Sequence, residues 1–189
     1  MVHPDKIFGR LGNRLFQGAY IYNQVAKGII PDIYVQDEKF FKESKEEIRA
    51  LYSQDIGAPV DMVAIHVRRG ANPINPDEPK YCDNPFMVNL SDTLYYEDAM
   101  SMFKGEDFLV FSDDIEWCKK QEIFKDCEFA NGTELEDLNL MAACKGIIMA
   151  NSSFSWWAAY LSNAKVIAPK LWYTDGVERT KCPKEWLRI

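Results

Sequence analysis

The sequence predicts an α/β fold built on a parallel sheet. From Val60 onward, short apolar segments alternate with amphipathic segments at the lengths of strands and helices. Apolar strands separated by helices are typical of a parallel sheet with right-handed crossovers. The chain has 189 residues, of which 47% are hydrophobic and 13% aromatic, and this composition indicates a folded protein of one domain, or one and a fraction.

The first 57 residues predict a short strand, a glycine loop, a helix, a second strand and a second helix. The loop covers residues 8–13, and the helix that follows is expected over 14–27, with a glycine directly after it as a C-terminal stop. The second strand is expected at 33–35. Residues 37–52 carry dense charge with apolar residues at helical spacing, which predicts an exposed amphipathic helix.

The rest of the chain predicts regular alternation. Strands are expected at 62–67, 108–111, 127–130, 146–150 and 165–168, and helices at 92–104, 114–123, 134–145, 154–162 and 183–188. Thr133 and Glu136 have the spacing of a capping box for the helix that follows them. Residues 71–90 are rich in proline and too long for an ordinary connection, so they are interpreted as a functional lid or an insertion.

The composition excludes several classes of function. The net charge of −7 and the pI of about 4.9 leave no general basic surface for nucleic acid. With two histidines and no CxxC pair, a zinc site is not expected. The odd number of cysteines favours free thiols, and neither a signal peptide nor a membrane span is visible, so a cytoplasmic location is expected. The cysteines are Cys82, Cys118, Cys127, Cys144 and Cys182.

The run Ile65–Gly70 is the first candidate site. His66 and Arg68 alternate with buried Val67, so both point to the same side at the carboxyl end of a strand. Parallel sheets bind ligands at that end, and a guanidinium matches phosphate oxygens in two places at once. A diphosphate would explain this placement, and pairing with a nearby acid would explain it equally well. Arg69 points to the opposite face and is interpreted as structural.

A second candidate site follows the next strand. Ser112, Asp113 and Asp114 end that strand and precede a helix, so they could contact a ligand or cap the helix. Asp137 stands near the start of a later helix, where an acid is also favoured by the helix dipole.

A third candidate site is the polar cluster Asn151, Ser152 and Ser153. It connects a strand to a helix, and free backbone N–H groups at a helix start bind phosphate. Simple serine capping is the alternative, with Trp156 and Trp157 filling the core. The glycine loop at the N-terminus matches no dinucleotide or Walker motif.

Taken together, these segments resemble the α-1,2-fucosyltransferases of glycosyltransferase family 11. The order and spacing of the segments cover nearly the whole chain. The segments are residues 9–17 (GRLGNRLFQ), 66–70 (HVRRG), 111–114 (FSDD), 137–141 (DLNLM), 151–157 (NSSFSWW) and 183–189 (PKEWLRI).

The resemblance implies a GT-B-like fold and inverting, metal-independent transfer of L-fucose from GDP-fucose to a glycan hydroxyl. No cofactor is implied beyond this donor. It also implies two parts, a Rossmann-like donor-binding domain over 59–189 and a reduced N-terminal α/β half over 1–58 on the acceptor side.

The resemblance also implies roles for individual residues. Arg68, with His66 beside it, would be catalytic, because the arginine stabilises the leaving diphosphate. Asp113 and Asp114 are the candidates for the base that deprotonates the acceptor. The residues implied in donor binding are Gly12, Asn13, Ser112, Asp113, Asp137, Asn151, Ser152 and Ser153.

Two departures from the family keep other functions open. Ala71 stands where the family's arginine motif continues to an acid, and the segment between Gln17 and Asp61 is shorter than in typical members. A non-catalytic nucleotide-sugar or glycan-binding module, and a transferase using another sugar nucleotide, are the alternatives.

Overall fold

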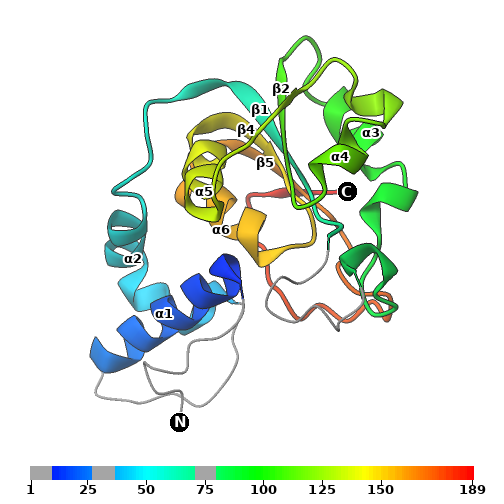
Figure 1. The fold of residues 1–189 in the computed structure, drawn as a ribbon. Coiled ribbons are helices and arrows are strands. Elements are labelled where there is room, and N and C mark those ends of the chain that lie inside the picture. The colour runs from blue at the N-terminus through cyan, green and yellow to red at the C-terminus, as the bar shows by residue number, and fades with distance from the viewer. Residues whose placement is uncertain (1–9, 27–36, 71–79) are drawn as a thin grey trace.

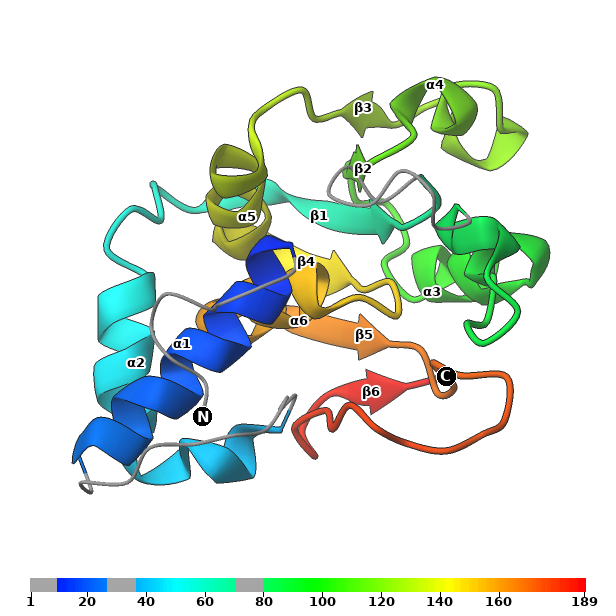
Figure 2. The same ribbon diagram turned by 60° about the horizontal axis from the view of Figure 1, so that its bottom comes forward.

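The protein is a mixed α/β structure with one six-stranded sheet, as the sequence predicts (Figure 1). The computed structural model describes residues 10–26, 37–70 and 80–189. All paired strands are parallel, and Figure 2 shows several of them side by side with their arrowheads pointing the same way. The strands are β1 (Val60–Val67), β2 (Phe108–Ser112), β3 (Glu128–Phe129), β4 (Cys144–Ile148), β5 (Lys165–Ala168) and β6 (Leu187–Arg188).

The strand order fixes where a ligand can bind. The order is β3-β2-β1-β4-β5-β6, so the chain moves outward from β1 in one direction, returns to the centre, and moves outward from β4 in the other direction. This is the order of open dinucleotide-binding sheets. Loops leaving β1 and β4 diverge at that point, which opens a crevice at the carboxyl ends of the two central strands.

Helices cover both faces of the sheet (Figures 1 and 2). One core cluster joins the sheet to α1, α2, α5 and α6, and a second cluster joins the opposite face to α3 and α4. The α-helices are α1 (Leu11–Ala26), α2 (Lys45–Tyr52), α3 (Tyr95–Ser101), α4 (Ile115–Cys118), α5 (Glu134–Ala143) and α6 (Ser153–Leu161). Short 3-10 helices are η2 (Glu38–Phe40), η3 (Lys42–Ser44), η4 (Tyr81–Asp83), η5 (Leu90–Asp92) and η6 (Glu122–Phe124).

An aromatic cluster attaches the N-terminal helices to α6. Trp156 and Trp157 are fully buried, which confirms that they fill core. Phe16 of α1 lies 4.4 Å from Trp156 and 5.0 Å from Trp157, measured between ring centroids, and Phe41 stacks on Trp157. Arg49 of α2 donates to two carbonyls at the end of α6, a favourable place for a cation.

Several expected boundaries differ from the structure. The helix expected at 183–188 is wrong, because the backbone of Leu187 pairs with Ile167 in β6 while Trp186 packs on Trp156. The helix expected at 114–123 breaks into α4 and η6. Residues 37–52 form η2, η3 and α2 instead of one helix.

Other expectations are confirmed or lie outside the described residues. The capping box at α5 is present, since the Thr133 hydroxyl accepts from the Glu136 N–H while the Glu136 carboxylate accepts from the Thr133 N–H at 2.8 Å. The five cysteines are free thiols. The strands expected before residue 10 and at 33–35, and part of the 71–90 segment, lie outside the described residues. No helix in the described part of the chain is long and apolar enough to cross a membrane.

Candidate functional site

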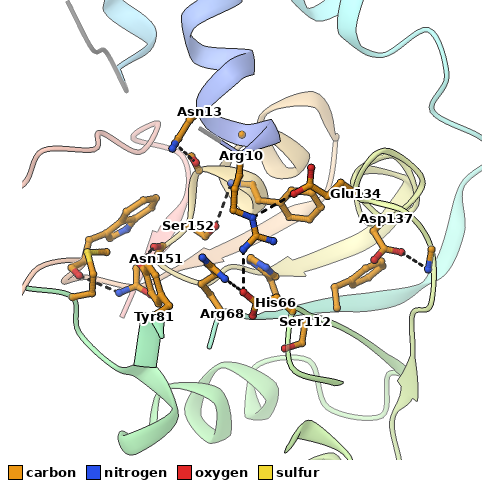
Figure 3. A pocket seen from close by; sticks show the side chains of 18 of the residues that line it. Arg10, Asn13, His66, Arg68, Tyr81, Ser112, Glu134, Asp137, Asn151 and Ser152 are labelled. Carbon is orange, nitrogen blue, oxygen red and sulfur yellow. Dashed lines mark hydrogen bonds and ion pairs between the residues drawn. The ribbon is translucent and has the colours of Figure 1, made fainter. Parts of the chain in front are cut away.

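A single pocket lies at the carboxyl ends of the central strands (Figure 3). Its volume of about 370 Å³ falls within the range of small-molecule sites. It brings together every residue that the sequence predicts as catalytic or donor-binding, although these come from both ends of the chain. Those residues are Gly12, Asn13, His66, Arg68, Ser112, Asp113, Asp137, Asn151, Ser152 and Ser153.

The N-terminus of α6 opens into this pocket. The Ser152 side chain accepts a hydrogen bond from the N–H of Phe154 at 3.3 Å, so it caps the helix. The Ser153 hydroxyl donates to Asn13 Oδ1 at 2.7 Å. Capping and ligand binding are therefore compatible here, because the cap leaves the helix dipole and the remaining N–H groups directed at the pocket.

A glycine contact brings α1 against the same point. A Cβ on Gly12 would lie 2.4 Å from the carbonyl carbon of Ser153 and 2.5 Å from the nitrogen of Phe154. Only a residue without a side chain permits this approach. Gly12 and Asn13 were expected in a loop, but they form the first turn of α1, which begins at Leu11. The starts of two helices thus meet at one edge of the pocket.

Arg68 is held by the carboxylate of Asp113. Asp113 Oδ1 accepts from the N–H groups of Arg69 and Gly70, each at 2.9 Å. Asp113 Oδ2 forms an ion pair with Arg68 and a second, at 3.1 Å, with Arg10. Asp113 therefore receives four contacts on two oxygens. This occupancy favours a role in positioning the arginines over the predicted role as a base.

Arg68 remains a cation in this environment. Burial lowers its pKa to about 10, assisted by the charge of Arg10, and this value still leaves the guanidinium protonated at neutral pH. The ring of Tyr81 lies 4.8 Å from the guanidinium carbon, a cation–π distance. The predicted pairing of Arg68 with an acid is therefore confirmed, and Arg68 also lines the pocket, where its binding of a diphosphate stays a prediction.

His66 is buried and uncharged. Its exposed fraction is 5%, and burial, followed by the charges of Arg68 and Arg10, lowers its pKa to about 3. Its Nδ1 atom is buried without a hydrogen-bond partner among the described residues. In the pocket, His66 can exchange a hydrogen bond with a ligand as a neutral imidazole, but it supplies no positive charge.

Comparison with known proteins shows which family this chain belongs to. The family model "Glycosyl transferase family 11" matches residues 18–189. The chain belongs to glycosyltransferase family 11. It is 35% identical to an alpha-1,2-colitosyltransferase of Escherichia coli, over 88% of this chain and 65% of that enzyme. No solved structure matches the chain.

Other relatives are more distant. The O-antigen biosynthesis glycosyltransferase WbnK of Escherichia coli is 28% identical, over 74% of this chain and 48% of its own length. Human galactoside alpha-(1,2)-fucosyltransferase 1 is 29% identical, over 58% of this chain and 31% of its own. The chain thus spans at most about two thirds of these relatives' lengths.

In this family 11 chain, Asp113 lies directly after the neighbouring strand β2 and supplies a carboxylate to Arg68. Ala71 stands where the family's motif has an acid, and it lies outside the described residues. A Cβ on Gly70 would lie 2.7 Å from the Asp113 carbonyl oxygen, so the turn after β1 packs closely on the end of β2.

The remaining acids divide between capping and the pocket. Asp114 caps α4 by accepting from the N–H of Trp117 and does not line the pocket, so the structure does not support it as a base. Asp137 lines the pocket, accepts from the N–H of Gly132 at 3.1 Å, and has a pKa raised by burial. Ser112 accepts from the N–H of Asp114 at 3.0 Å.

Arg69 lies on the other side of the sheet from the pocket. Its guanidinium carbon is 3.7 Å from the centroid of the Trp117 ring, which agrees with the structural role inferred from strand alternation. The sequence reasoning did not name nine of the pocket residues, and these are Arg10, Tyr81, Met87, Phe111, Gly132, Glu134, Phe154, Trp172 and Tyr173. Of these, Arg10, Phe111 and Phe154 had a signal, because they stand inside the segments that carry the family resemblance.

Proposed function

We propose that this protein is a glycosyltransferase that transfers L-fucose from GDP-fucose to a glycan hydroxyl, inverting the anomeric centre without a metal ion. The observation that carries this proposal is the convergence of Arg68, the α6 N-terminus and Asn13 on one pocket at the switch point of the sheet. A diphosphate is the ligand whose charge and shape suit a guanidinium fork beside free backbone N–H groups.

These groups would act on the leaving group. As the bond from fucose to the diphosphate breaks, negative charge grows on the β-phosphate. Arg68 and the first N–H groups of α6 are fixed in advance by Asp113 and by the Ser152 cap, so they need little reorganisation. One well-placed donor of this kind is worth about 3–4 kcal/mol of transition-state stabilisation.

A second donor sugar has specific support. The relative that matches 88% of this chain is named a colitosyltransferase, so a colitose-bearing nucleotide is the alternative to GDP-fucose. A binding module without catalysis is the other alternative, and it is supported by Ala71, which stands where the family's arginine motif continues to an acid.

We propose that residues 1–58 form the acceptor-side part, while residues 59–189 bind the donor. Arg10, Gly12 and Asn13 support this division, because they reach the rim of the pocket from outside the sheet domain. We also propose a cytoplasmic location, which the five free thiols support.

The experiment compares Arg68→Lys with Arg188→Lys. Arg188 pairs with Glu178, and neither residue lines the pocket, so Arg188 is the matched control. We expect Arg68→Lys to lower the rate of sugar transfer from GDP-fucose by about 100-fold or more, with the control unchanged. Transfer from the colitose nucleotide alone would identify that donor, and binding of GDP-fucose without transfer to any acceptor would identify a binding module.

A further inference from the structure

The strand order arranges the pocket along one line. Asp137 follows β3, Arg68 follows β1, Ser152 follows β4 and Trp172 follows β5, and these strands lie in that order across the sheet. The distance from β3 to β5 is four strand intervals, or about 19 Å. In Figure 3, Asp137 lies at one side, Arg68 and Ser152 lie between, and Asn151 lies at the other side.

This order constrains an extended nucleotide sugar. If the diphosphate lies between Arg68 and Ser152, the nucleoside and the sugar must occupy opposite ends of the pocket. Asp137 is at one end, with a carboxylate that can accept from a nucleobase or ribose. The opposite end, after β5, is therefore the place for the sugar.

The sugar end is covered by two loops that form an arch, residues 81–88 and 172–174. Met87 pairs with Tyr173 in an isolated antiparallel bridge, and the N–H of Val88 donates to the carbonyl of Trp172 at 3.0 Å. Two loops with no regular strand between them have little intrinsic rigidity, so their geometry depends on such cross-links.

Asn151 fastens both loops of the arch. Its side-chain amide donates to the carbonyl of Val88 at 2.8 Å and to that of Trp172 at 3.1 Å, and its exposed fraction is 2%. The Tyr81 hydroxyl donates to the Asn151 carbonyl at 2.5 Å. The side-chain NH₂ is thus fully used inside the protein, which fits a positioning residue.

Trp172 lines the pocket, and its indole N–H is a buried hydrogen-bond donor that the described residues leave unused. Its exposed fraction is 6%, and its indole N–H has no hydrogen-bond partner among the described residues. Trp157 shares this feature but is fully buried in the core and does not line the pocket, whereas the Trp156 indole donates to the Lys181 carbonyl at 2.8 Å. A buried donor without a partner costs about 1–3 kcal/mol, so a donor beside a cavity is suited to a ligand oxygen.

We propose that Trp172, Met87 and Tyr173 form the subsite for the transferred sugar, with Asn151 as the positioning residue that holds it. The indole N–H donates to a sugar hydroxyl, while the thioether and the aromatic ring contact a face that lacks a hydroxyl. One donor beside apolar side chains selects a deoxyhexose. This inference rests on the proposed function, and it deepens that function by assigning a sugar subsite.

The test separates sugar binding from nucleotide binding. Calorimetry measures the dissociation constants of GDP and GDP-fucose for the wild type, Trp172→Phe and Trp186→Phe. Phe keeps an aromatic ring and removes the N–H group, and Trp186 is a buried tryptophan outside the pocket. We expect Trp172→Phe to weaken the affinity for GDP-fucose by about 2- to 12-fold, the range of one hydrogen bond, and to leave the affinity for GDP unchanged. Trp186→Phe should change neither ligand.

Asn151→Asp and GDP-L-galactose extend the test. Because the aspartate cannot donate to the two carbonyls, we expect weaker binding of GDP-fucose and unchanged binding of GDP. GDP-L-galactose carries a hydroxymethyl group where GDP-fucose carries a methyl group. We expect the wild type to bind GDP-L-galactose more weakly than GDP-fucose, and Met87→Ala to narrow this difference in affinity. Equal losses for GDP and GDP-fucose in Trp172→Phe, or no loss for either, would overturn the subsite. Failure of the wild type to bind GDP at all would overturn the proposed function itself.

Discussion

Replacing Gly12 with alanine tests how closely α1 lies against α6. The new Cβ would stand 2.4–2.6 Å from three backbone atoms of Ser153 and Phe154, whereas ordinary contacts begin at 3.4 Å. Because backbone atoms cannot rotate away as a side chain can, the start of α1 must move by about 1 Å. That movement would also extend the 2.7 Å hydrogen bond between Asn13 and Ser153 beyond the usual range.

The expected cost follows from these distances. Overpacking of this kind costs about 1–3 kcal/mol, and loss of the hydrogen bond adds about 0.5–1.5 kcal/mol. Alanine gains at most about 1 kcal/mol in helix propensity over glycine. We therefore expect the free energy of unfolding to fall by about 0.5–3.5 kcal/mol. Each kcal/mol corresponds to about 2–4 °C in Tm for a chain of this size.

Gly57→Ala is the control. A Cβ on Gly57 would meet no heavy atom within 4 Å, and Gly57 does not have a positive φ. We expect this variant to be as stable as the wild type or up to about 1 kcal/mol more stable. Urea unfolding followed by circular dichroism measures both variants, and calorimetry measures their affinity for GDP. Equal stability and equal GDP affinity for Gly12→Ala and the wild type would refute the close approach of the two helices.

Three further changes test the site and its surroundings. Asp113→Asn removes the negative charge that Arg10 and Arg68 share, and we expect the free energy of unfolding to fall by about 3 kcal/mol. GDP should raise the Tm of this variant by more than it raises the Tm of the wild type. An unchanged Tm would contradict the positioning role. The pKa of His66 is about 3 in the folded protein against 6.5 unfolded, so the unfolded state binds the proton first and stability is lost as pH falls below 6.5, by about 2 kcal/mol at pH 5. His66→Gln should remove that part of the loss, and parallel pH profiles for the two proteins would argue against a neutral buried histidine. Thr133→Ala should cost about 1 kcal/mol through loss of the α5 cap while leaving GDP affinity unchanged, and a change in that affinity would count against a purely local cap.

The sequence predicted the parallel sheet because its strands are marked by local signals. Val63–Ile65 and Ile147–Ile148 are apolar runs between helical patterns, and both are buried in the central strands. The capping box at Thr133 is also local, and it marked the start of α5 correctly. The prediction for the end of the chain was wrong because its structure depends on a distant segment. Residues 187–188 become a strand only through pairing with β5.

The candidate site was partly visible in the sequence. The predicted residues each follow a strand or begin a helix, and parallel strands bring such positions to one edge. Arg10, Met87 and Trp172 were missed because loops place them, and no periodicity marks a loop position. The family resemblance indicated the function class, but it could not show that Asp113 already holds Arg68.

By itself, the sequence determined the α/β class, the strands that carry the site, and the residues gathered at its centre. These features depend on patterns within a few residues, where periodicity and capping act. Only the tertiary structure decided that α6 leaves no room for a side chain at Gly12, that Asp113 pairs with two arginines, and that Asn151 bonds both loops of the arch. Each of these is a contact between residues distant along the chain, and its existence depends on how whole elements pack.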